Sequence, residues 1–477
     1  MKKTFNNVLL NAFYQVFIIL IPIITIPYVS RTIGPKSLGT NSFYTSISLF
    51  LGYLILMGLS QIGPKEISQA DIDKRKKIFF ELWTIQLMVG LIVTVLYMIF
   101  FLFSKNSFYY MLQVPYLLSI ILDISWFYIG VENMKTVIVR NVAVKIITLL
   151  LILLIVKDPN DLWIYMLINS IGACVSNIFF WIGLKRYFIH DGTNINNMRL
   201  FNVKYFKNSL ILLIPQIAAQ FYTSIDKIVV RYFSDDIQLS FYDQSQKMAR
   251  IVLAIVTSIS IVLMPLVAKY DKDGDDESIV KVITTSSEIT CFLSMLFTSI
   301  LVLNSPVFVP WFFGNDFKDM ITNMGISSFI IIPIALGSIF SNQFALAKGL
   351  YKIYSIPFIV GALINPVLNI ILVSNFNSVG ASFALLITEI LVCFFRIYLI
   401  RKQIDVKPFL LEYFKLFCTF VIVLILGKII YIQFHSEIIT LIINSLIEFF
   451  IFLLGIYILN KKFIYRNINK IQKLLNK

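Results

Sequence analysis

Residues 20–44 read LIPIITIPYVSRTIGPKSLGTNSFY, and this stretch decides the fold. An apolar run containing two prolines ends at Arg31 and turns at Gly34 into a second apolar run. Further along, residues 213–244 repeat the LIP triplet, an arginine ahead of a polar turn and a tyrosine-rich helix start. Two copies of one membrane hairpin, each with a cation near its end, predict a duplicated bundle with a basic interior, as in transporters.

The composition places the chain in a lipid bilayer. Of its 477 residues, 58% are apolar and only 14% are charged, and the mean hydropathy is +0.83. Soluble proteins keep about 25% of their residues charged. The net charge of +15 does not indicate nucleic acid, because the cations lie in alternate loops between apolar runs. Such a pattern fixes the orientation of a membrane protein.

Apolar runs of about 20 residues recur along the whole chain. The predicted spans are 8–30, 39–61, 80–103, 109–130, 137–156, 162–184, 209–230, 240–267, 283–303, 322–346, 354–374, 379–399, 411–431 and 438–459. Runs of this length satisfy their backbone groups in lipid only as helices. The sequence therefore predicts an all-α integral membrane protein with about 14 transmembrane helices.

The loop charges predict the orientation of these helices. Loops on the side of the N-terminus carry most of the lysines and arginines, whereas the opposite loops hold few. This bias predicts a multi-pass protein with both termini in the cytoplasm. The first run, 8–30, is expected to be a retained span. The outward loops are short, and the longest is expected at residues 304–320, where aromatic residues would form an interfacial belt.

Polar linkers predict three parts. The longest inner linker, residues 185–208, separates two blocks of six spans, and residues 401–408 set off a final pair. The expected domains are an N-terminal six-helix lobe at 1–203, a C-terminal six-helix lobe at 204–405, and a helix pair with a cytoplasmic tail at 406–477. The acidic run DKDGDDE is expected to be a solvated turn rather than a calcium loop, because its ligand spacing does not fit.

Charged residues inside the spans need an explanation, because each costs about 2.5–3.5 kcal/mol at the centre of a membrane helix. Asp123 lies in the middle of a predicted span, while Glu132, Arg140 and Lys145 flank the turn that follows and extend into the next helix. Arg140 and Lys145 are close to one side of that helix and could bind an anion or Glu132. Asp123 could instead pair with a cation and hold two helices together.

Two further groups lie on consecutive helices. Lys227 and Arg231 are four residues apart on one helix face, beside Asp226 as a counter-ion. The spacing of Asp243, Lys247 and Arg250 puts all three on one face of the next helix. Each group could form only an interhelical salt bridge, but with the earlier cations they predict a basic interior. Other carboxyl groups are candidates for pairing or proton coupling, without a way to choose among them: Glu288, Glu389 beside Arg396, and Glu448.

Several motifs carry a family resemblance. They are YVSRTIGPKSLG after the first span, IGPKEI after the second, D-x-S-W-F-x-x-G-x-E at residues 123–132 and DKIVVRYF at residues 226–233. In this order they resemble the Wzx-type repeat-unit flippases of polysaccharide synthesis, within the multidrug/oligosaccharidyl-lipid/polysaccharide exporter (MOP) superfamily. The resemblance covers most of the first eight spans, and beyond residue 270 it rests on hydropathy.

The resemblance implies the architecture and the activity. Two six-helix lobes would form a V around a central cavity, with a peripheral C-terminal helix pair. The cargo would be an undecaprenyl-diphosphate-linked oligosaccharide, moved from the inner to the outer leaflet of the bacterial cytoplasmic membrane for capsule, O-antigen or exopolysaccharide synthesis. The resemblance places cavity charges at Arg31, Asp123, Glu132, Arg140, Lys227 and Arg231. We expect alternating access by rocking of the lobes, with Pro22, Pro27 and Pro215 as kink points.

The expected partners follow from the same reading. They are the lipid-linked oligosaccharide and the bilayer, with a polysaccharide polymerase as a further candidate partner; the chain is expected to be monomeric and to bind no nucleic acid. No cofactor is expected, because the two histidines and four cysteines lack metal-ligand spacing, while coupling to an H⁺ or Na⁺ gradient stays open.

Three alternatives differ in their sequence requirements. A lipid II flippase also has fourteen helices and a cationic cavity, whereas the signature at residues 123–132 suits capsule or O-antigen carriers better. A cation-coupled multidrug exporter would favour an acidic cavity and about twelve spans. A membrane polysaccharide polymerase or other enzyme would need acids or histidines on sizeable outer loops, which are absent from this sequence. The sequence therefore predicts a transporter rather than an enzyme.

Overall fold

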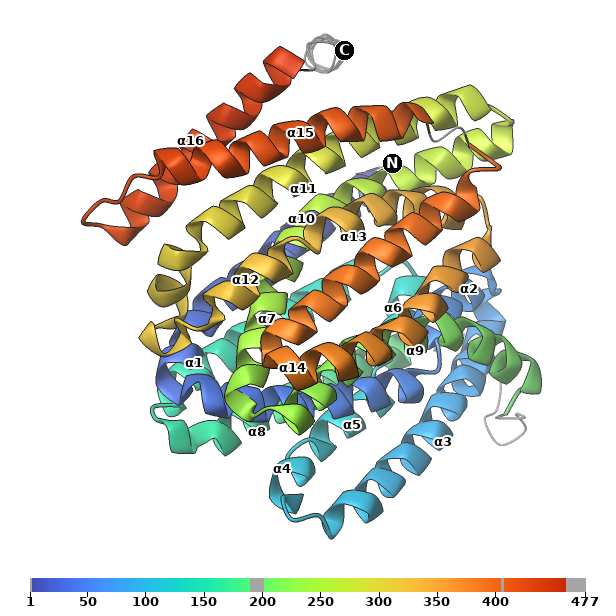
Figure 1. The fold of residues 1–477 in the computed structure, drawn as a ribbon. Coiled ribbons are helices and arrows are strands. Elements are labelled where there is room, and N and C mark those ends of the chain that lie inside the picture. The colour runs from blue at the N-terminus through green and yellow to red at the C-terminus, as the bar shows by residue number, and fades with distance from the viewer. Residues whose placement is uncertain (1, 189–200, 405–406, 460–477) are drawn as a thin grey trace. The chain divides into compact units, whose positions relative to one another are not determined.

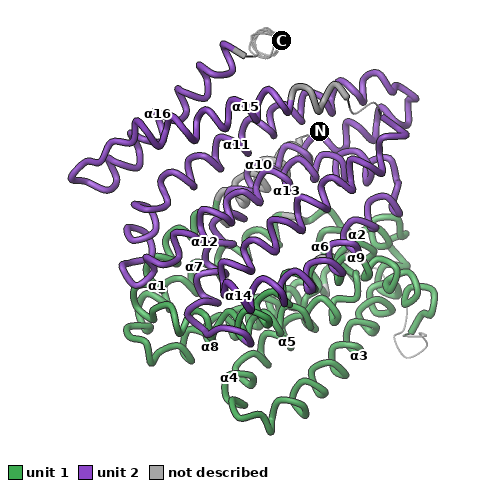
Figure 2. The backbone as a smooth tube through the Cα atoms, in the orientation of Figure 1, with its two compact units in different colours: residues 1–231 green, residues 232–477 purple. Residues whose placement is uncertain are grey.

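The structure, a computed structural model, describes the backbone of residues 2–188, 201–404 and 407–459 (Figure 1). The predicted cytoplasmic tail and the domain boundary predicted at 405–406 lie outside these ranges. Helices make up every regular element within the described ranges, and no strand occurs there. The chain divides into two compact units, residues 1–231 and 232–477 (Figure 2).

Among its described residues, unit 1 contains eight α-helices and most of a ninth. They are α1 (Lys2–Leu56), α2 (Leu59–Gln69), α3 (Arg75–Leu102), α4 (Ser107–Met111), α5 (Val114–Ile121), α6 (Ser125–Gly130), α7 (Met134–Ile155), α8 (Leu162–Leu184) and α9 (Val203–Phe233). Within this unit α5 packs on α8, α2 packs on α6, and α7 packs on both α1 and α8. These contacts place α7, which carries Arg140 and Lys145, against two neighbouring helices.

The helix α1 is broken at Gly34. Its backbone angles there are φ 75° and ψ 174°, while helical geometry continues on both sides. A positive φ is unfavourable for any residue with a Cβ atom, but glycine adopts it without this cost. Glycine therefore suits the break. Pro22 and Pro27 lie in the helical segment before Gly34. The main break therefore lies at the glycine rather than at these two prolines.

One predicted span, 109–130, differs from the structure because it is divided into α4, α5 and α6. The side chain of Gln86, on α3, reaches the gap between α5 and α6. Its Nε2 donates to the backbone carbonyl of Asp123 at 3.0 Å, and its Oε1 accepts from Trp126 Nε1 at 3.1 Å. Because the side chain satisfies a carbonyl that a continuous helix would use, the apolar run can break without leaving that group unpaired.

The other α-helices of the described residues, with one π-helix, lie in unit 2. They are α10 (Asp236–Asp273), α11 (Asp276–Phe313), α12 (Met320–Ser328), α13 (Ile331–Ser338), the π-helix η6 (Ile339–Leu346), α14 (Tyr351–Ile400), α15 (Lys407–Ile430) and α16 (Glu437–Leu459). The helix α11 packs against α10, α12, α15 and α16. It continues to Phe313, so the outward loop predicted at 304–320 is helical over its first half.

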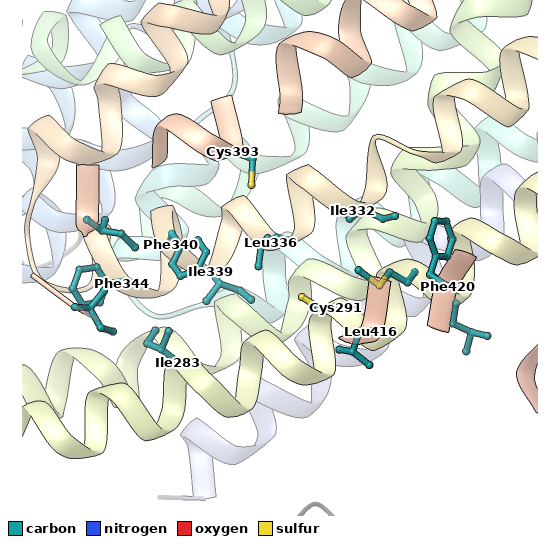
Figure 3. Packing of buried hydrophobic residues seen from close by; sticks show 14 of the residues in the cluster. Ile283, Cys291, Ile332, Leu336, Ile339, Phe340, Phe344, Cys393, Leu416 and Phe420 are labelled. Carbon is teal, nitrogen blue, oxygen red and sulfur yellow. The ribbon is translucent and has the colours of Figure 1, made fainter. Parts of the chain in front are cut away.

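The core of unit 2 is a cluster of buried apolar side chains (Figure 3). Phe340 and Phe344 from η6, Cys291 from α11, Cys393 from α14 and Phe420 from α15 belong to it. All four cysteines are free thiols, and two of them pack in this core. Apolar packing is therefore the role of Cys291 and Cys393.

The acidic run at residues 271–277 forms the turn between α10 and α11. Gly274 closes α10 with φ 70°, and Asp275 Oδ1 accepts a 2.9 Å hydrogen bond from Ser278 N at the start of α11. Lys348 Nζ lies 3.0 Å from Asp271 Oδ1 and 3.4 Å from Asp276 Oδ1. One lysine thus holds a turn that the sequence predicts to be only solvated.

Eleven helical segments in the described ranges are long and apolar enough to cross a membrane. Two of them, Leu20–Gln69 and Tyr351–Ile400, are 50 residues long. Each contains a break in its helical backbone, the first at Gly34 and the second at Asn377, where φ is 51°. Membrane-spanning helices are confirmed by length and composition, and the count of fourteen stays a prediction.

Candidate functional site

Arg31 lies one turn before the break in α1. Its side chain is exposed, whereas Ser30 and Ile33 on either side of it are buried. The guanidinium therefore stands on the outer face of the helix close to the point where its direction changes. A cation at such a position is accessible to an anionic ligand.

A hydrogen bond and aromatic packing hold the motif at residues 123–132 in place within unit 1. Asp123 Oδ1 accepts a 2.9 Å hydrogen bond from Ser125 N at the start of α6. Trp126, Phe127 and Tyr128 are buried in a cluster that also contains Phe79. This arrangement accounts for the carboxylate through a local Asx turn and for the aromatic run through packing. Glu132 follows in the turn before α7, with an exposed side chain and a φ of 57°.

Arg140, on α7, is fastened to α8. Its Nη1 donates to the Ser176 carbonyl at 2.9 Å and to Asn177 Oδ1 at 2.7 Å, and its Nη2 donates to Asn141 Oδ1. The guanidinium carbon lies 3.6 Å from the ring centroid of Phe180. Three acceptors and one aromatic face fix this side chain, so the geometry favours a structural role in joining the two helices.

Lys145 lies further along α7 and differs from Arg140. Its side chain is half-buried, and neither a hydrogen bond nor an ion pair joins it to another described residue. An ammonium group in a membrane helix without a local counter-ion loses hydration without compensation. Of Arg140 and Lys145, Lys145 is therefore the one whose charge remains available for a ligand.

The charged residues predicted on α9 lie in different surroundings. Asp226 is fully buried, and Lys227 beside it is half-buried. The guanidinium carbon of Arg231 lies 4.0 Å from the ring centroid of Phe43 and 5.1 Å from that of Tyr44. Tyr44 in turn stacks on Tyr109, with centroids 5.4 Å apart. Arg231 thus closes a cation–aromatic stack that includes the second half of α1.

The group on α10 is paired within its own helix. Lys247 Nζ lies 2.7 Å from Asp243 Oδ2, and the carboxylate side chain is 3% exposed while the lysine side chain is 42% exposed. The spacing of four residues predicts this pairing. Arg250, one turn further on, is exposed. These residues belong to unit 2, and their convergence with the cations of unit 1 on one cavity stays a prediction.

Some residues that build the site are absent from the sequence prediction. Phe43 and Tyr44 receive Arg231, Asn177 receives Arg140, and Gln86 organises the motif around Asp123. A single polar side chain inside an apolar run is the signal that could have found Gln86 and Asn177. The aromatic pair could have been suspected from the tyrosine-rich helix start in both copies of the repeated stretch.

Metal binding has no support in the described residues. No group of three or more His, Cys, Asp or Glu there is placed to hold a metal ion. The charged side chains instead present guanidinium and ammonium groups beside aromatic rings. This chemistry suits phosphate-like anions and planar or apolar surfaces such as sugar rings.

Sequence comparisons relate this chain to a family of polysaccharide biosynthesis proteins and to two proteins named as O-antigen transporters. Residues 5–271 match the protein family described as "Polysaccharide biosynthesis protein". Two proteins named "Putative O-antigen transporter" align over nearly their whole length. The one from Shigella dysenteriae is 22% identical and covers 80% of this chain and 96% of its own. The one from Escherichia coli strain K12 is 21% identical and covers 83% and 97%.

Solved structures show the fold. The lipid II flippase MurJ in an inward closed conformation has a TM-score of 0.72 and 15% identity, over 96% of this chain and 100% of that one. An inward-facing multidrug resistance MATE family transporter of the MOP superfamily has a TM-score of 0.61 and 14% identity, over 80% and 94%. The predicted all-helical transporter fold is therefore confirmed.

Proposed function

Because the chain belongs to the family of polysaccharide biosynthesis proteins, and the resemblance to Wzx-type flippases of the MOP superfamily is thereby confirmed, we propose that it is a lipid-linked oligosaccharide flippase. It moves an undecaprenyl-diphosphate-linked repeat unit from the inner to the outer leaflet of the cytoplasmic membrane. The product serves capsule, O-antigen or exopolysaccharide synthesis. The relatives named as O-antigen transporters support this class of cargo.

One observation carries the proposal. Lys145 is a half-buried cation within a membrane-spanning helix, with neither a hydrogen bond nor an ion pair to any other described side chain. A diphosphate head group would supply the missing counter-charge, because phosphate oxygens accept charge-assisted hydrogen bonds. The remaining proposed contacts lie on the same unit or on α10: Arg31, Asp123, Glu132, Arg140, Asp226, Lys227, Arg231, Lys247 and Arg250.

The contacts of these residues divide them into two roles in the proposal. Arg31, Lys145 and Lys227 would meet the head group, and Lys247 and Arg250 on α10 are further proposed contacts of the cargo. Arg140 and Asp123 would hold the surrounding helices in place, as their hydrogen bonds to Asn177 and Ser125 favour. Aromatic rings beside Arg231 would offer a surface to sugar rings, which stack on aromatic faces.

The path of the cargo follows from its chemistry. The lipid tail can remain in the bilayer while the charged head crosses beside the cations. An inside-negative potential favours outward movement of a negative charge by about 2.3 kcal/mol per 100 mV. We propose rocking of lobes at residues 1–203 and 204–405 around the cargo, with residues 406–477 peripheral. The breaks at Gly34 and Asn377 are candidate hinges.

The orientation is part of the same proposal. The bias of lysine and arginine toward alternate loops supports a multi-pass protein of the bacterial cytoplasmic membrane with both termini in the cytoplasm. The chain would act as a monomer, without a cofactor, and would deliver its cargo to a polysaccharide polymerase. Coupling to H⁺ or Na⁺ is a separate question that transport assays in defined gradients address.

A lipid II flippase is the second candidate. The fold match to MurJ favours it, because that structure is covered completely by this chain. The two candidates share the diphosphate head and differ in the glycan. The family match and the named relatives support the polysaccharide repeat unit instead.

The test follows the lipid-linked repeat unit in a strain that lacks the protein. We expect the unit to build up on the inner leaflet, and the intact gene to restore its appearance on the outer surface of spheroplasts. Lys145→Ala and Lys227→Ala should reduce export several-fold at unchanged protein level. Lys428→Ala, which removes an exposed cation at the end of α15, serves as the matched control and should export normally.

Two results would contradict the proposal. Normal export of repeat units in the deletion strain would exclude this protein as their flippase. A block in cell-wall precursor transport in that strain, with repeat-unit export intact, would assign the lipid II alternative.

A further inference from the structure

Three polar residues recur at every fourth position along the buried face of α16. They are Thr440, Asn444 and Glu448, and their side chains are 1–2% exposed. The first two fasten the turn between α15 and α16. Thr440 Oγ1 accepts from Phe434 N at 3.0 Å, and Asn444 both donates to and accepts from the backbone of Ile432, at 2.8 Å and 3.0 Å. Glu448 has no part in this turn.

Glu448 instead faces α11. Asn304 Nδ2 donates a 2.9 Å hydrogen bond to Glu448 Oε1. Three oxygen atoms at this place have no hydrogen-bond partner among the described residues: Glu448 Oε2, Asn304 Oδ1 and the hydroxyl of Tyr431. Each belongs to a different helix or helix end, of α16, α11 and α15 respectively. Buried oxygens without a partner are rare in folded proteins and point to a ligand that the side chains themselves do not supply.

The close packing of α15 against α11 and α16 covers this carboxyl group. A Cβ placed on Gly427 of α15 would lie 2.6 Å from Leu303 Cδ1 and 3.5 Å from Glu448 Cγ. The absence of a side chain at Gly427 therefore lets α15 approach α11 and α16 closely enough to cover Glu448. The group lies in the middle of α16, a helix long and apolar enough to span the membrane.

No positive charge compensates Glu448. Among the described residues, no lysine, arginine or histidine forms an ion pair with it. The titratable group that interacts with it electrostatically is Tyr431, directly after α15, while Lys428 is exposed; α11 presents the neutral amide of Asn304. An ionised carboxylate at such a place loses its hydration, and a single amide hydrogen bond offsets that cost only in part.

We propose that Glu448 is a proton-binding site. The proton is carried on Oε2, the oxygen that Asn304 leaves without a donor, and the resulting O–H group finds an acceptor in Asn304 Oδ1. Binding converts a carboxylate into a neutral acid, and release returns the proton to water. The bound proton holds the pair α15–α16 against α11, and its loss weakens this contact. The site is defined by binding alone and does not depend on the cargo of the protein.

The first experiment measures the proton directly by infrared spectroscopy of the full-length protein in lipid nanodiscs. The difference between neutral and strongly alkaline pH should contain a carboxylic-acid C=O band in the wild type. Glu448→Gln should lack this band, and Glu437→Gln, at the exposed start of α16, should retain it. Identical difference spectra for the wild type and Glu448→Gln would overturn the proposal.

A second arm distinguishes a proton from a metal cation. At constant neutral pH, replacing choline by sodium or potassium should leave the acid band unchanged. Loss of the band on addition of either ion would overturn the proton assignment and make the three oxygens a monovalent cation site.

A third measurement guards against a variant that fails to fold. Tyr431→Phe removes only the hydroxyl, which can donate to the ionised carboxylate, so the pH at which the acid band is lost should shift upward. In thermal unfolding, the wild type should lose several degrees of stability as alkaline pH ionises Glu448, and Glu448→Gln should show a smaller loss. Equal loss in both proteins, with an unshifted band in Tyr431→Phe, would contradict the proposal.

Discussion

Arg231 lies over the ring of Phe43, with its guanidinium carbon 4.0 Å from the ring centroid. The two residues come from the two copies of the repeated stretch, at residues 213–244 and 20–44. The stretches therefore meet in unit 1 through a cation and an aromatic face. A stack of this kind contributes about 0.5–2 kcal/mol.

Variants of this stack separate its charge from its packing. Phe43→Leu should lower the thermal unfolding temperature of the purified protein, because the aromatic face is lost while the charge remains. Arg231→Lys should keep most repeat-unit export, because it keeps the charge, and Arg231→Ala should lose it. Equal export by Arg231→Ala and the wild type would show that the charge serves stability alone.

Arg140 and Lys145 should behave differently although both are cations of α7. Arg140→Gln removes charge-assisted hydrogen bonds to Ser176 and Asn177, so we expect a loss of about 1.5–3 kcal/mol in stability. Lys145→Gln breaks no bond to a described residue and should leave thermal unfolding unchanged while export falls. Export and melting temperature measured on both variants check this division. A large loss of stability in Lys145→Gln would contradict it.

Gln86 should be essential for the packing of the motif at residues 123–132. Gln86→Leu leaves the buried indole N–H of Trp126 and the carbonyl of Asp123 unpaired, which costs about 1–3 kcal/mol. In Trp126→Phe the same Gln86→Leu change should cost less, because one of the two unpaired groups is gone. A double-mutant cycle on the unfolding temperature measures this coupling, and strictly additive losses would exclude it.

Much of the fold follows from apolar run length, while the internal breaks do not. The division of the predicted span 109–130 depends on Gln86, a residue of another helix. Likewise Asn304 is predicted in a loop, but α11 continues to Phe313 because helical geometry does not end where the apolar run ends. Hydropathy predicts where in the sequence an apolar helix lies, but it does not predict a break that a neighbouring helix stabilises.

The candidate site shows the same limit. The pairing of Lys247 with Asp243 follows from a spacing of four residues on one helix. The contact of Arg140 with Asn177 joins residues 37 positions apart, and it depends on how α7 packs against α8. Sequence spacing therefore identifies the cations, but the division into structural and available charges requires the packing of the helices.

The turn between α10 and α11 should respond to alkaline pH. Partial burial acts against the charged form of Lys348, but hydrogen bonds and attraction from Asp271 and Asp276 outweigh it and raise the pKa of this lysine above its ordinary value of 10.5. Its contribution to stability is thus fully present below that value and is lost as the pH rises through the raised pKa. Because the carboxylates of Asp271 and Asp276 are 34% and 85% exposed, water screens both ion pairs, and the loss should be small, about 0.5 kcal/mol.

Lys348→Gln tests this turn. The variant should be slightly less stable than the wild type at neutral pH, and the difference should vanish in strongly alkaline solution. Thermal unfolding at a series of pH values measures the difference. Lys352→Gln, an exposed lysine at the start of α14, is the matched control and should show no such dependence.

Thr440 and Asn444 give the turn before α16 a shape that it cannot adopt by itself, since its own backbone groups bond to side chains that come later in the chain. In a growing chain, this turn can form only after the start of α16 has been synthesised. The helices α15 and α16 are thus expected to enter the bilayer together as one hairpin. In a chain stalled on the ribosome before residue 440, the turn should lack a fixed shape, which cysteine crosslinking across the turn would detect.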